Sequence, residues 1–227
     1  METLIFDCDG VLVDSEAIAE KTLIQRLGEW LPDIQPDSAL RQALGMTTAA
    51  ILEHIERDSA HQLPGDALER IDTDIEARLV RELLAIEGVA EVVARLDMPL
   101  AIVSNSRRQR VVASLEATGL DAWLGSVPLF TADQAERPKP DPAVYLLAAR
   151  SMGCSPAECL VIEDSVSGVK AAHAAGMTVI GFTGASHIEA GHEQRLLEAG
   201  AWQIMNDMQG LEALIAQWRD RRGRNLA

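Results

Sequence analysis

The sequence contains few cysteines, and they form no disulfide framework. There are three, Cys8, Cys154 and Cys159, and an odd number without paired spacing excludes a fold that depends on disulfides. Cys154 and Cys159 also lack the second pair of ligands that a structural zinc site needs. The five histidines form no metal-binding pattern, and we predict that His187 and His192 are surface residues beside a glycine-containing loop. The scarcity of cysteine favours a reducing compartment, so we expect a cytoplasmic protein.

Basic residues are also scarce. Lysine and arginine number 20 against 35 aspartates and glutamates, which gives a formal net charge of −15. Such a chain is a poor candidate for binding nucleic acid or anionic membranes, because both depend on lysine and arginine. No apolar run approaches the length of a membrane span, and the N-terminus has no basic-then-apolar leader. We therefore expect a soluble protein with no nucleic-acid or membrane partner, and we interpret the basic run 219–224 as a solvated helix end. The sequence does not determine the oligomeric state, and a monomer is our expectation.

The stretch 4–15 is the most informative part of the chain. It begins as an apolar run that predicts a buried parallel strand, and it ends in Asp7 and Asp9, followed at once by Gly10. Aspartate is depleted in strands because its carboxylate needs water or a partner. Carboxylates at the end of a buried strand are suited to binding Mg²⁺ or attacking an electrophile. The structural alternative is that both aspartates are turn formers or a helix cap.

The rest of the chain divides into a helical part and an alternating part. Residues 15–86 contain several helical patterns and no convincing strand, whereas helices and strands alternate from residue 87 onward. We expect strands at 100–103, 127–130, 159–162, 178–182 and 203–205, and helices at 89–96, 108–117, 141–152 and 166–175. This order predicts an α/β fold, a doubly wound parallel sheet formed by 1–14 and 87–227, with an all-helical unit at 15–86 inserted into it.

Polar residues follow the three clearest strands. Asp7 and Asp9 end the first, Ser104-Asn105 the second, and Glu163-Asp164 the fourth. The carboxyl ends of parallel strands meet at one edge of the sheet, so this edge gathers up to four carboxylates. They cannot all stay ionised without a cation, and a hard ion such as Mg²⁺ suits oxygen ligands.

Lys139 lies in a proline-flanked segment that can hold its ammonium group over the same edge. Carboxylates, a metal ion and a lysine together suit phosphoryl transfer, in which positioning and charge neutralisation do most of the work. Taken singly, Lys139 is equally well explained as a solvated lysine and Ser104 as a strand-end cap. The joint pattern is more specific than either residue.

At these residues the chain resembles the haloacid dehalogenase-like hydrolase superfamily. The similar segments, in the order of the family's four motifs, are Asp7-Cys8-Asp9-Gly10-Val11, Ser104-Asn105, Lys139, and Glu163-Asp164 with the Ser-x-x-Gly-Val-x-Ala-Ala stretch that follows. The similarity covers essentially the whole chain. A helical insertion directly after the first motif resembles the branch that includes β-phosphoglucomutase and small sugar-phosphate phosphatases. The resemblance implies a Rossmann-like core, with residues 15–86 as a cap that determines substrate specificity.

The resemblance also implies the roles of the carboxylates. Asp7 is the expected nucleophile, which becomes an aspartyl phosphate, and Asp9 is the expected general acid and then base. Mg²⁺ is expected on the Asp7 carboxylate, the Asp9 backbone carbonyl and Asp164, with Glu163 as a further or water-mediated ligand. Members of the family that remove halogens lack the second aspartate, so Asp9 favours phosphate esters as substrates.

The substrate phosphate is expected to lie against a second set of residues. The resemblance assigns the transferring phosphoryl oxygens to Ser104, the Asn105 backbone and Lys139. Gly10 is expected to let the backbone turn closely around the phosphate. Arg107 follows the second motif, and it is expected either at the far end of the substrate or on the surface of its helix.

Two departures bear on the substrate. The mutase pattern has a histidine where this chain has Ala19, and an arginine shortly after the glycine that corresponds to Gly45, where residues 46–48 are Met-Thr-Thr. Both changes remove groups that grip the second phosphate of a bisphosphate.

We therefore expect a Mg²⁺-dependent phosphatase acting on a sugar phosphate or a phosphorylated sugar acid. The alternatives are a β-phosphoglucomutase-type sugar phosphomutase and a non-catalytic binding protein that retains the fold. The complete set Asp7, Asp9, Lys139 and Asp164 argues against the last.

Overall fold

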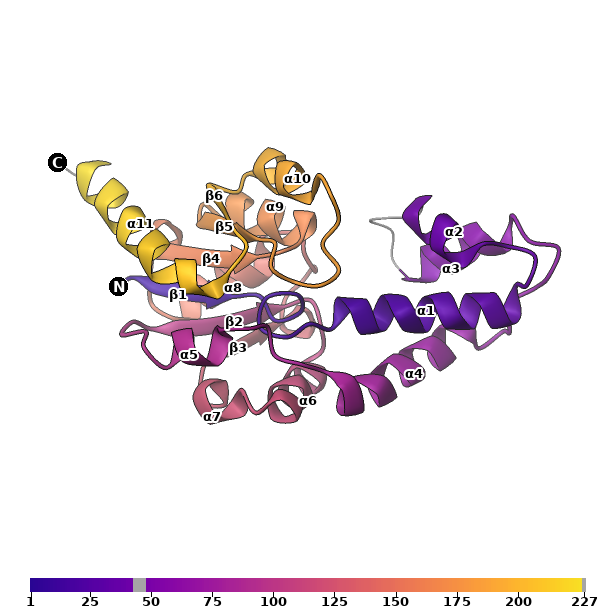
Figure 1. Cartoon of the computed structure of the whole chain (residues 1–227). Coiled ribbons are helices and arrows are strands. Elements are labelled where there is room, and N and C mark those ends of the chain that lie inside the picture. Colours follow the sequence, from indigo (N-terminus) through magenta and orange to yellow (C-terminus); the bar gives the residue numbers. More distant parts are fainter. Residues whose placement is uncertain (43–47, 226–227) are drawn as a thin grey trace. The chain divides into compact units, whose positions relative to one another are not determined.

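The computed structural model describes residues 1–42 and 48–225, and the chain divides into two compact units. The core unit consists of Met1–Ser15 and Leu83–Ala227, and the helical unit is Glu16–Glu82. Figure 1 shows the order of the elements along the chain. Residues 45–47, on which the comparison with the mutase pattern partly rests, lie outside the described residues.

A six-stranded parallel sheet forms the centre of the core unit. Its strands are β1 Thr3–Phe6, β2 Leu100–Ser104, β3 Leu129–Thr131, β4 Cys159–Glu163, β5 Thr178–Phe182 and β6 Gln203–Met205. They lie in the order β3-β2-β1-β4-β5-β6, and every neighbouring pair is parallel. The predicted α/β fold with a doubly wound parallel sheet is confirmed. β1 lies between β2 and β4, where the strand order reverses, and ligands in such sheets bind at this point.

The helices cover the sheet with small and apolar side chains. The core helices are α5 Val89–Val93, α6 Arg108–Thr118, α7 Asp121–Leu124, α8 Ala143–Ser151, α9 Val166–Ala174, α10 His192–Ala199 and α11 Leu211–Asn225. One buried cluster joins Ile5, Val103 and Val161 of the strands to Val144 of α8 and Val169 of α9. Such close packing of helix on sheet fixes the positions of the polar residues that follow the strands.

Some element boundaries differ from those predicted. β3 begins at Leu129 rather than at 127, because Pro128 has no N–H to donate to the ladder. α5 ends at Val93 rather than at 96, because the amides of Arg95 and Leu96 donate to carbonyls only three residues back, those of Val92 and Val93. The basic run 219–224 does lie at the end of α11, but Arg219 and Arg222 each bind Glu2 at 2.8 Å, so it is not simply solvated.

The chain turns sharply after β1. Phe6 pairs with Ile102 of β2 and with Ile162 of β4, and the amide of Asp7 donates to the carbonyl of Ile162 at 3.0 Å. Gly10 then has a φ of 77°, a left-handed conformation that favours glycine. The strand pairing therefore delivers the Asp7–Gly10 segment to the carboxyl edge of the sheet.

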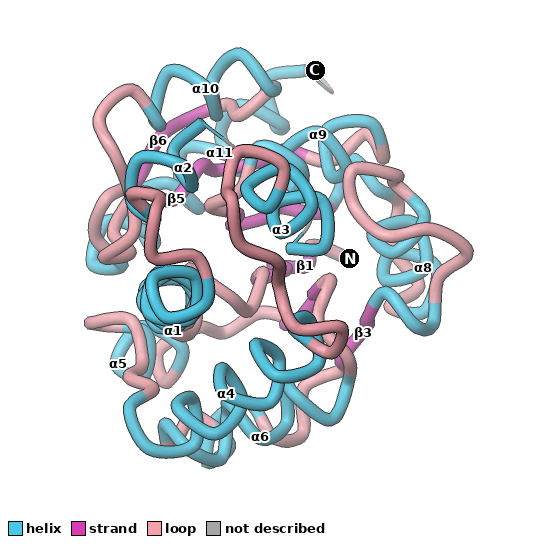
Figure 2. Tube along the Cα trace, turned by 90° about the vertical axis from the view of Figure 1, so that its right-hand side faces the viewer, coloured by secondary structure: helices cyan, strands magenta, loops and turns pink. Residues whose placement is uncertain are grey.

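The helical unit is built from α1 Glu16–Trp30, α2 Pro36–Gln42, α3 Thr48–Glu56 and α4 Ala67–Glu82. α1 and α4 run side by side (Figures 1 and 2), with a buried stripe on α4 formed by Ala67, Ile71, Ile75 and Leu79. This stripe has helical spacing, which is why the sequence pattern predicts the helix. In the described part of the chain, no helix has both the length and the apolarity to span a membrane.

Candidate active site

The ammonium group of Lys139 joins the first and fourth strand ends. Its Nζ lies 2.6 Å from Oδ1 of Asp7 and 2.6 Å from Oε1 of Glu163, and it also donates to the carbonyl of Val103 at 3.3 Å. The side chains of Lys139 and Glu163 are 3% and 0% exposed. Ion pairs this deeply buried persist only where charge and hydrogen bonds are both matched. Lys139 is therefore a fixed member of the site.

Burial and neighbouring charges shift the pKa values of these groups in ways that matter for chemistry. Burial raises the pKa of Asp7 well above its ordinary value. The Lys139 ammonium opposes that shift, while Glu163, Asp164 and Asp9 reinforce it. Burial alone would lower the pKa of Lys139, but the charges of Asp7 and Glu163 outweigh it and raise that pKa. Lys139 is thus a cation, and a further positive charge near Asp7 would favour its ionised form.

Every acceptor position of Glu163 is taken by a protein donor. Oε1 accepts from Lys139 and from the hydroxyl of Tyr145 at 2.9 Å, and Oε2 accepts from the amide and the hydroxyl of Ser165, both at 3.0 Å. A carboxylate has about four lone-pair sites. A Cβ on Gly168 would lie 1.6 Å from Oε1 of Glu163, so the helix after β4 needs glycine there. Glu163 is held as the counter-ion of Lys139.

Asp9 lies among hydroxyl groups. Ser15 donates to its Oδ1 at 2.7 Å, and Ser106 and Ser104 donate to its Oδ2 at 2.8 and 3.3 Å. Nη2 of Arg110 lies 3.9 Å from Oδ1. Asp9 is therefore oriented by weak, exchangeable donors rather than by a lysine, which distinguishes its environment from that of Asp7.

Asn105, which follows β2, hydrogen-bonds to the backbone of Lys139. Oδ1 of Asn105 accepts from the amide of Lys139 at 2.9 Å, and Nδ2 of Asn105 donates to the carbonyl of Lys139 at 3.3 Å. Ser104 is 1% exposed and its hydroxyl also accepts from the amide of Ser106 at 2.9 Å. Arg107 precedes α6 as an exposed residue, and among the described residues its side chain forms no ion pair with the carboxylates.

Two histidines predicted to be surface residues are only partly exposed, and both lie against Asp164. Nε2 of His187 lies 3.3 Å from Oδ2 of Asp164, and Nε2 of His192 lies 2.5 Å from its backbone oxygen. Gly10 packs against Asp164 and His187: an added Cβ there would lie 1.9 Å from Oδ2 of Asp164 and 3.1 Å from the His187 ring. Burial lowers the pKa of His192, so it donates to the carbonyl as a neutral ring. The sequence pattern missed these contacts because the residues are far apart along the chain.

The donor set at this edge suits a hard cation. Carboxylate oxygens of Asp7, Glu163 and Asp164 all lie within 4.8 Å of one another, and all three residues are buried. Their ligand atoms are oxygens, as Mg²⁺ prefers. One buried lysine leaves this cluster with an excess of negative charge. The residues present therefore fit a bound divalent cation.

Three further site residues escaped prediction from sequence. Tyr145 comes from the middle of a predicted helix, and its only signal is that it is the single tyrosine of the chain. Ser106 had a usable signal, since it lies two residues beyond Ser104 at the same strand end. Arg110 lies one helical turn further on, where the sequence shows only an arginine on a helix.

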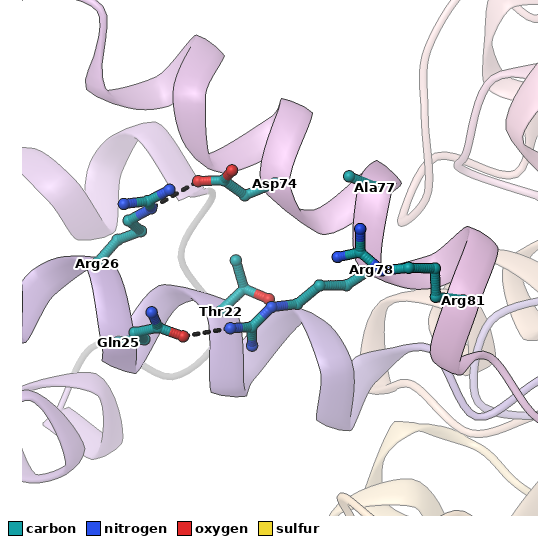
Figure 3. A pocket seen from close by; sticks show the side chains of 7 residues that line it. All are labelled: Thr22, Gln25, Arg26, Asp74, Ala77, Arg78 and Arg81. Atoms are coloured by element: carbon teal, nitrogen blue, oxygen red, sulfur yellow. Dashed lines mark hydrogen bonds and ion pairs between the residues drawn. The ribbon is translucent and has the colours of Figure 1, made fainter.

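The helical unit has a hollow of its own, which is basic. It has a volume of about 210 Å³ and is lined by Thr22, Gln25, Arg26, Asp74, Ala77, Arg78 and Arg81. In Figure 3 the lining side chains come from α1 and α4, with Arg26 bound to Asp74 at 2.6 Å and Arg78 bound to Gln25. The carboxylate that lines this hollow, Asp74, is paired with Arg26, whereas the cluster at the sheet edge brings three buried carboxylates together.

Comparison with known proteins identifies the family of this chain. A family model described as haloacid dehalogenase-like hydrolase matches residues 4–182. The 6-phosphogluconate phosphatase of Escherichia coli strain K12 is 29% identical over 188 residues, which cover 82% of this chain and 85% of that protein.

Two solved structures are similar over nearly their full length. A conserved haloacid dehalogenase-like protein of Agrobacterium tumefaciens strain C58 superposes with a TM-score of 0.87 at 39% identity, covering 96% of this chain and 98% of that one. A haloacid dehalogenase family hydrolase of Deinococcus radiodurans R1, solved with bound phosphate and sodium, has a TM-score of 0.81 at 30% identity, covering 96% of both chains.

Proposed function

The chain belongs to the haloacid dehalogenase-like hydrolase family, and we propose that it is a Mg²⁺-dependent phosphatase that hydrolyses a small phosphorylated metabolite through an aspartyl phosphate. The substrate class is a sugar phosphate or a phosphorylated sugar acid. Its products are inorganic phosphate and the free alcohol.

The observation that carries this proposal is the contrast between Asp7 and Asp9. Asp7 is held by the cation of Lys139 at 2.6 Å, which suits a carboxylate that must stay ionised to attack phosphorus. Asp9 is held by serine hydroxyls, which suit a carboxyl that gains and loses a proton. Two carboxylates with such different partners are expected to divide the nucleophilic and acid–base roles.

The reaction then has two steps. A carboxylate oxygen of Asp7 attacks phosphorus, the bond from phosphorus to the ester oxygen breaks, and the departing oxygen takes the proton of Asp9. Asp9 next takes a proton from a water molecule, whose oxygen attacks the aspartyl phosphate and releases inorganic phosphate. Both aspartates return to their starting states. Proton transfer of this kind typically contributes about 10²–10⁴-fold to the rate.

The Asp7 and Asp164 carboxylates and the Asp9 backbone carbonyl would hold Mg²⁺. When bound, Mg²⁺ would neutralise charge on the phosphoryl oxygens. Glu163 would contribute negative charge near this ion and hold Lys139 rather than ligate the ion directly, because its acceptor positions are filled by Lys139, Tyr145 and Ser165.

The remaining site residues would bind the phosphoryl group and the substrate. Ser104, the Asn105 backbone and Lys139 would donate to the phosphoryl oxygens, and Gly10 would allow the backbone to approach them. Arg107 would reach the far end of the substrate. We assign recognition of the alcohol to residues 15–86, which the family resemblance identifies as the cap.

The comparisons support the substrate class. The Escherichia coli relative is described as a phosphatase of 6-phosphogluconate, a phosphorylated sugar acid. The Deinococcus radiodurans structure contains phosphate, the second product expected here.

A substrate screen tests the proposal. The purified protein would be incubated with a panel of sugar phosphates, polyol phosphates and phosphorylated sugar acids, with Mg²⁺ or with a chelator, and released phosphate would be measured. We expect turnover of some of these esters in Mg²⁺ and none in chelator. Absence of phosphate release from every ester, by a folded protein in saturating Mg²⁺, would favour a non-catalytic protein instead.

A further inference from the structure

Arg110 is a cation beside the proposed acid–base residue, and the reaction described above does not use it. It lies in the first turn of α6, its side chain is 30% exposed, and its Nη2 is 3.9 Å from Oδ1 of Asp9. Its Nε is buried and has no hydrogen-bond partner among the described residues. A buried N–H without an acceptor is costly, and because this Nε is buried, a ligand would have to bind Arg110 through its Nη groups.

Asp9 does not accept a hydrogen bond from Arg110. A separation of 3.9 Å is too long for a hydrogen bond. The two oxygens of Asp9 already accept from Ser15 at 2.7 Å and from Ser106 at 2.8 Å. Arg110 therefore adds positive charge to the site while its donors stay available for another acceptor.

The arginines next to it in the sequence are placed differently. Arg107 and Arg108 are both exposed, and Nη1 of Arg108 donates to the carbonyl of Leu129 at 3.2 Å. Arg110 alone of these three is half-buried and within 4 Å of a proposed catalytic carboxylate.

We propose that Arg110 binds a carboxylate group of the substrate, so that the enzyme prefers phosphate esters of hydroxy acids to esters of neutral alcohols. This inference rests on the proposed phosphatase function, in which Asp9 faces the ester oxygen. A carboxylate on the leaving alcohol would supply two oxygens for a paired, bidentate hydrogen bond to the guanidinium of Arg110.

The charges favour a carboxylate over a second phosphate group. A carboxylate carries one negative charge, which one guanidinium balances. A phosphate dianion carries two, so one of them would remain unbalanced beside Asp9. The chain as a whole has a net charge of −15, so it has no surplus of cations to compensate.

The distances place the carboxylate near the reacting bond. Asp9 must lie within about 2.6–3.2 Å of the ester oxygen to protonate it. Arg110 lies 3.9 Å from Asp9, so an acceptor bound to it lies within about 10 Å of that oxygen. Hydroxy acids of three to six carbons can span this distance.

Two matched pairs of substrates test the proposal. 3-Phosphoglycerate and glycerol 3-phosphate differ only by a carboxylate in place of a hydroxymethyl group, and so do 6-phosphogluconate and glucitol 6-phosphate. For each pair the ratio of kcat/KM, acid over neutral ester, would be measured for the wild type and for Arg110→Gln, Arg110→Lys and Arg150→Gln. Arg150 is an exposed arginine at the end of α8 and serves as the matched control.

We expect the wild type to prefer the acid in at least one pair. Arg110→Gln should lower kcat/KM for that acid by about 10- to 100-fold, mainly by raising KM. It should change kcat/KM for the neutral ester by less than about threefold. Arg110→Lys keeps the positive charge but lacks the planar guanidinium that forms two parallel hydrogen bonds, so its ratio of kcat/KM should lie between those of the wild type and Arg110→Gln. Arg150→Gln should behave as the wild type.

The proposal is overturned if the wild type prefers neither acid. It is also overturned if Arg110→Gln lowers kcat/KM equally for the acid and for the neutral ester. Circular dichroism and the melting temperature of each variant separate these outcomes from misfolding. Calorimetric binding of the preferred acid to Asp7→Asn proteins, with and without Arg110→Gln, measures the same contact without turnover. Failure of the proposed function itself is distinct, because the wild type would then release phosphate from none of the four esters.

Discussion

Nζ of Lys139 lies 2.6 Å from Oε1 of Glu163, and both side chains are almost completely buried. The pair connects the segment after β3 to the end of β4, and it presents the same ammonium group to Asp7. A buried ion pair of this kind ties the stability of the core unit to the geometry of the proposed nucleophile.

Glu163→Gln should destabilise the protein. It leaves the buried Lys139 ammonium with one carboxylate instead of two, and we expect the unfolding free energy to fall by about 3 kcal/mol. For a chain of this size that corresponds to a melting temperature lower by about 6–12 °C. Glu116→Gln on the exposed side of α6 is the matched control and should stay within about 0.5 kcal/mol of the wild type. Equal melting temperatures for the two variants, measured in chelator, would contradict the role of Glu163.

Asp7→Asn should abolish phosphate release while the protein stays folded, because an amide cannot attack phosphorus. We expect kcat to fall by more than about a thousandfold. Rapid acid quenching with a substrate labelled in its phosphate should trap label on the wild-type protein and none on the variant. Substantial phosphate release by a folded Asp7→Asn protein, free of contaminating phosphatase, would refute the covalent role.

Asp164 and its histidine partner should control the affinity for Mg²⁺. Asp164→Asn removes a charged ligand, and His187→Ala removes the Nε2 contact at 3.3 Å that orients this carboxylate. Loss of such an outer partner typically costs about 10- to 100-fold in metal affinity. Calorimetric titration of the metal-free protein with Mg²⁺ measures this without any substrate.

Two further variants make the histidine measurement specific. His187→Gln keeps a donor on the side chain and should recover part of the affinity. His173→Ala removes an exposed histidine at the end of α9 and should leave the affinity for Mg²⁺ unchanged. If His187→Ala binds Mg²⁺ as tightly as the wild type, the imidazole does not position Asp164.

Product analysis separates the phosphatase from the mutase. A mutase must keep water from the aspartyl phosphate and hold a bisphosphate in two orientations. Ala19 in α1 offers only a methyl group where the mutase pattern has a histidine. With β-glucose 1-phosphate and Mg²⁺ we therefore expect inorganic phosphate, without any need for a bisphosphate activator. Rapid formation of glucose 6-phosphate with little free phosphate would instead establish a mutase.

The sequence by itself determined the architecture of the core. Alternation of apolar runs with helical patterns predicts a parallel α/β sheet, because each buried strand and each amphipathic helix is encoded by local periodicity. The same local order places Asp7, Ser104 and Glu163 at strand ends, and all parallel strand ends share one edge. Only boundaries such as that of β3 shifted, where Pro128 withholds a hydrogen bond.

Only the tertiary structure decided which partner each polar group takes. Glu163 is saturated by Lys139, Tyr145 and Ser165. Ser165 is its neighbour in the sequence, but no local pattern connects Glu163 to Lys139 or Tyr145, which only the packed sheet and helices bring to it. The sequence likewise indicates only that Arg110 lies on a helix. The folded structure shows that α6 places it 3.9 Å from Asp9. Local periodicity specifies which face of an element is buried. Hydrogen bonds and ion pairs act over about 3–4 Å, so they depend on distances that exist only once the sheet and its helices have packed.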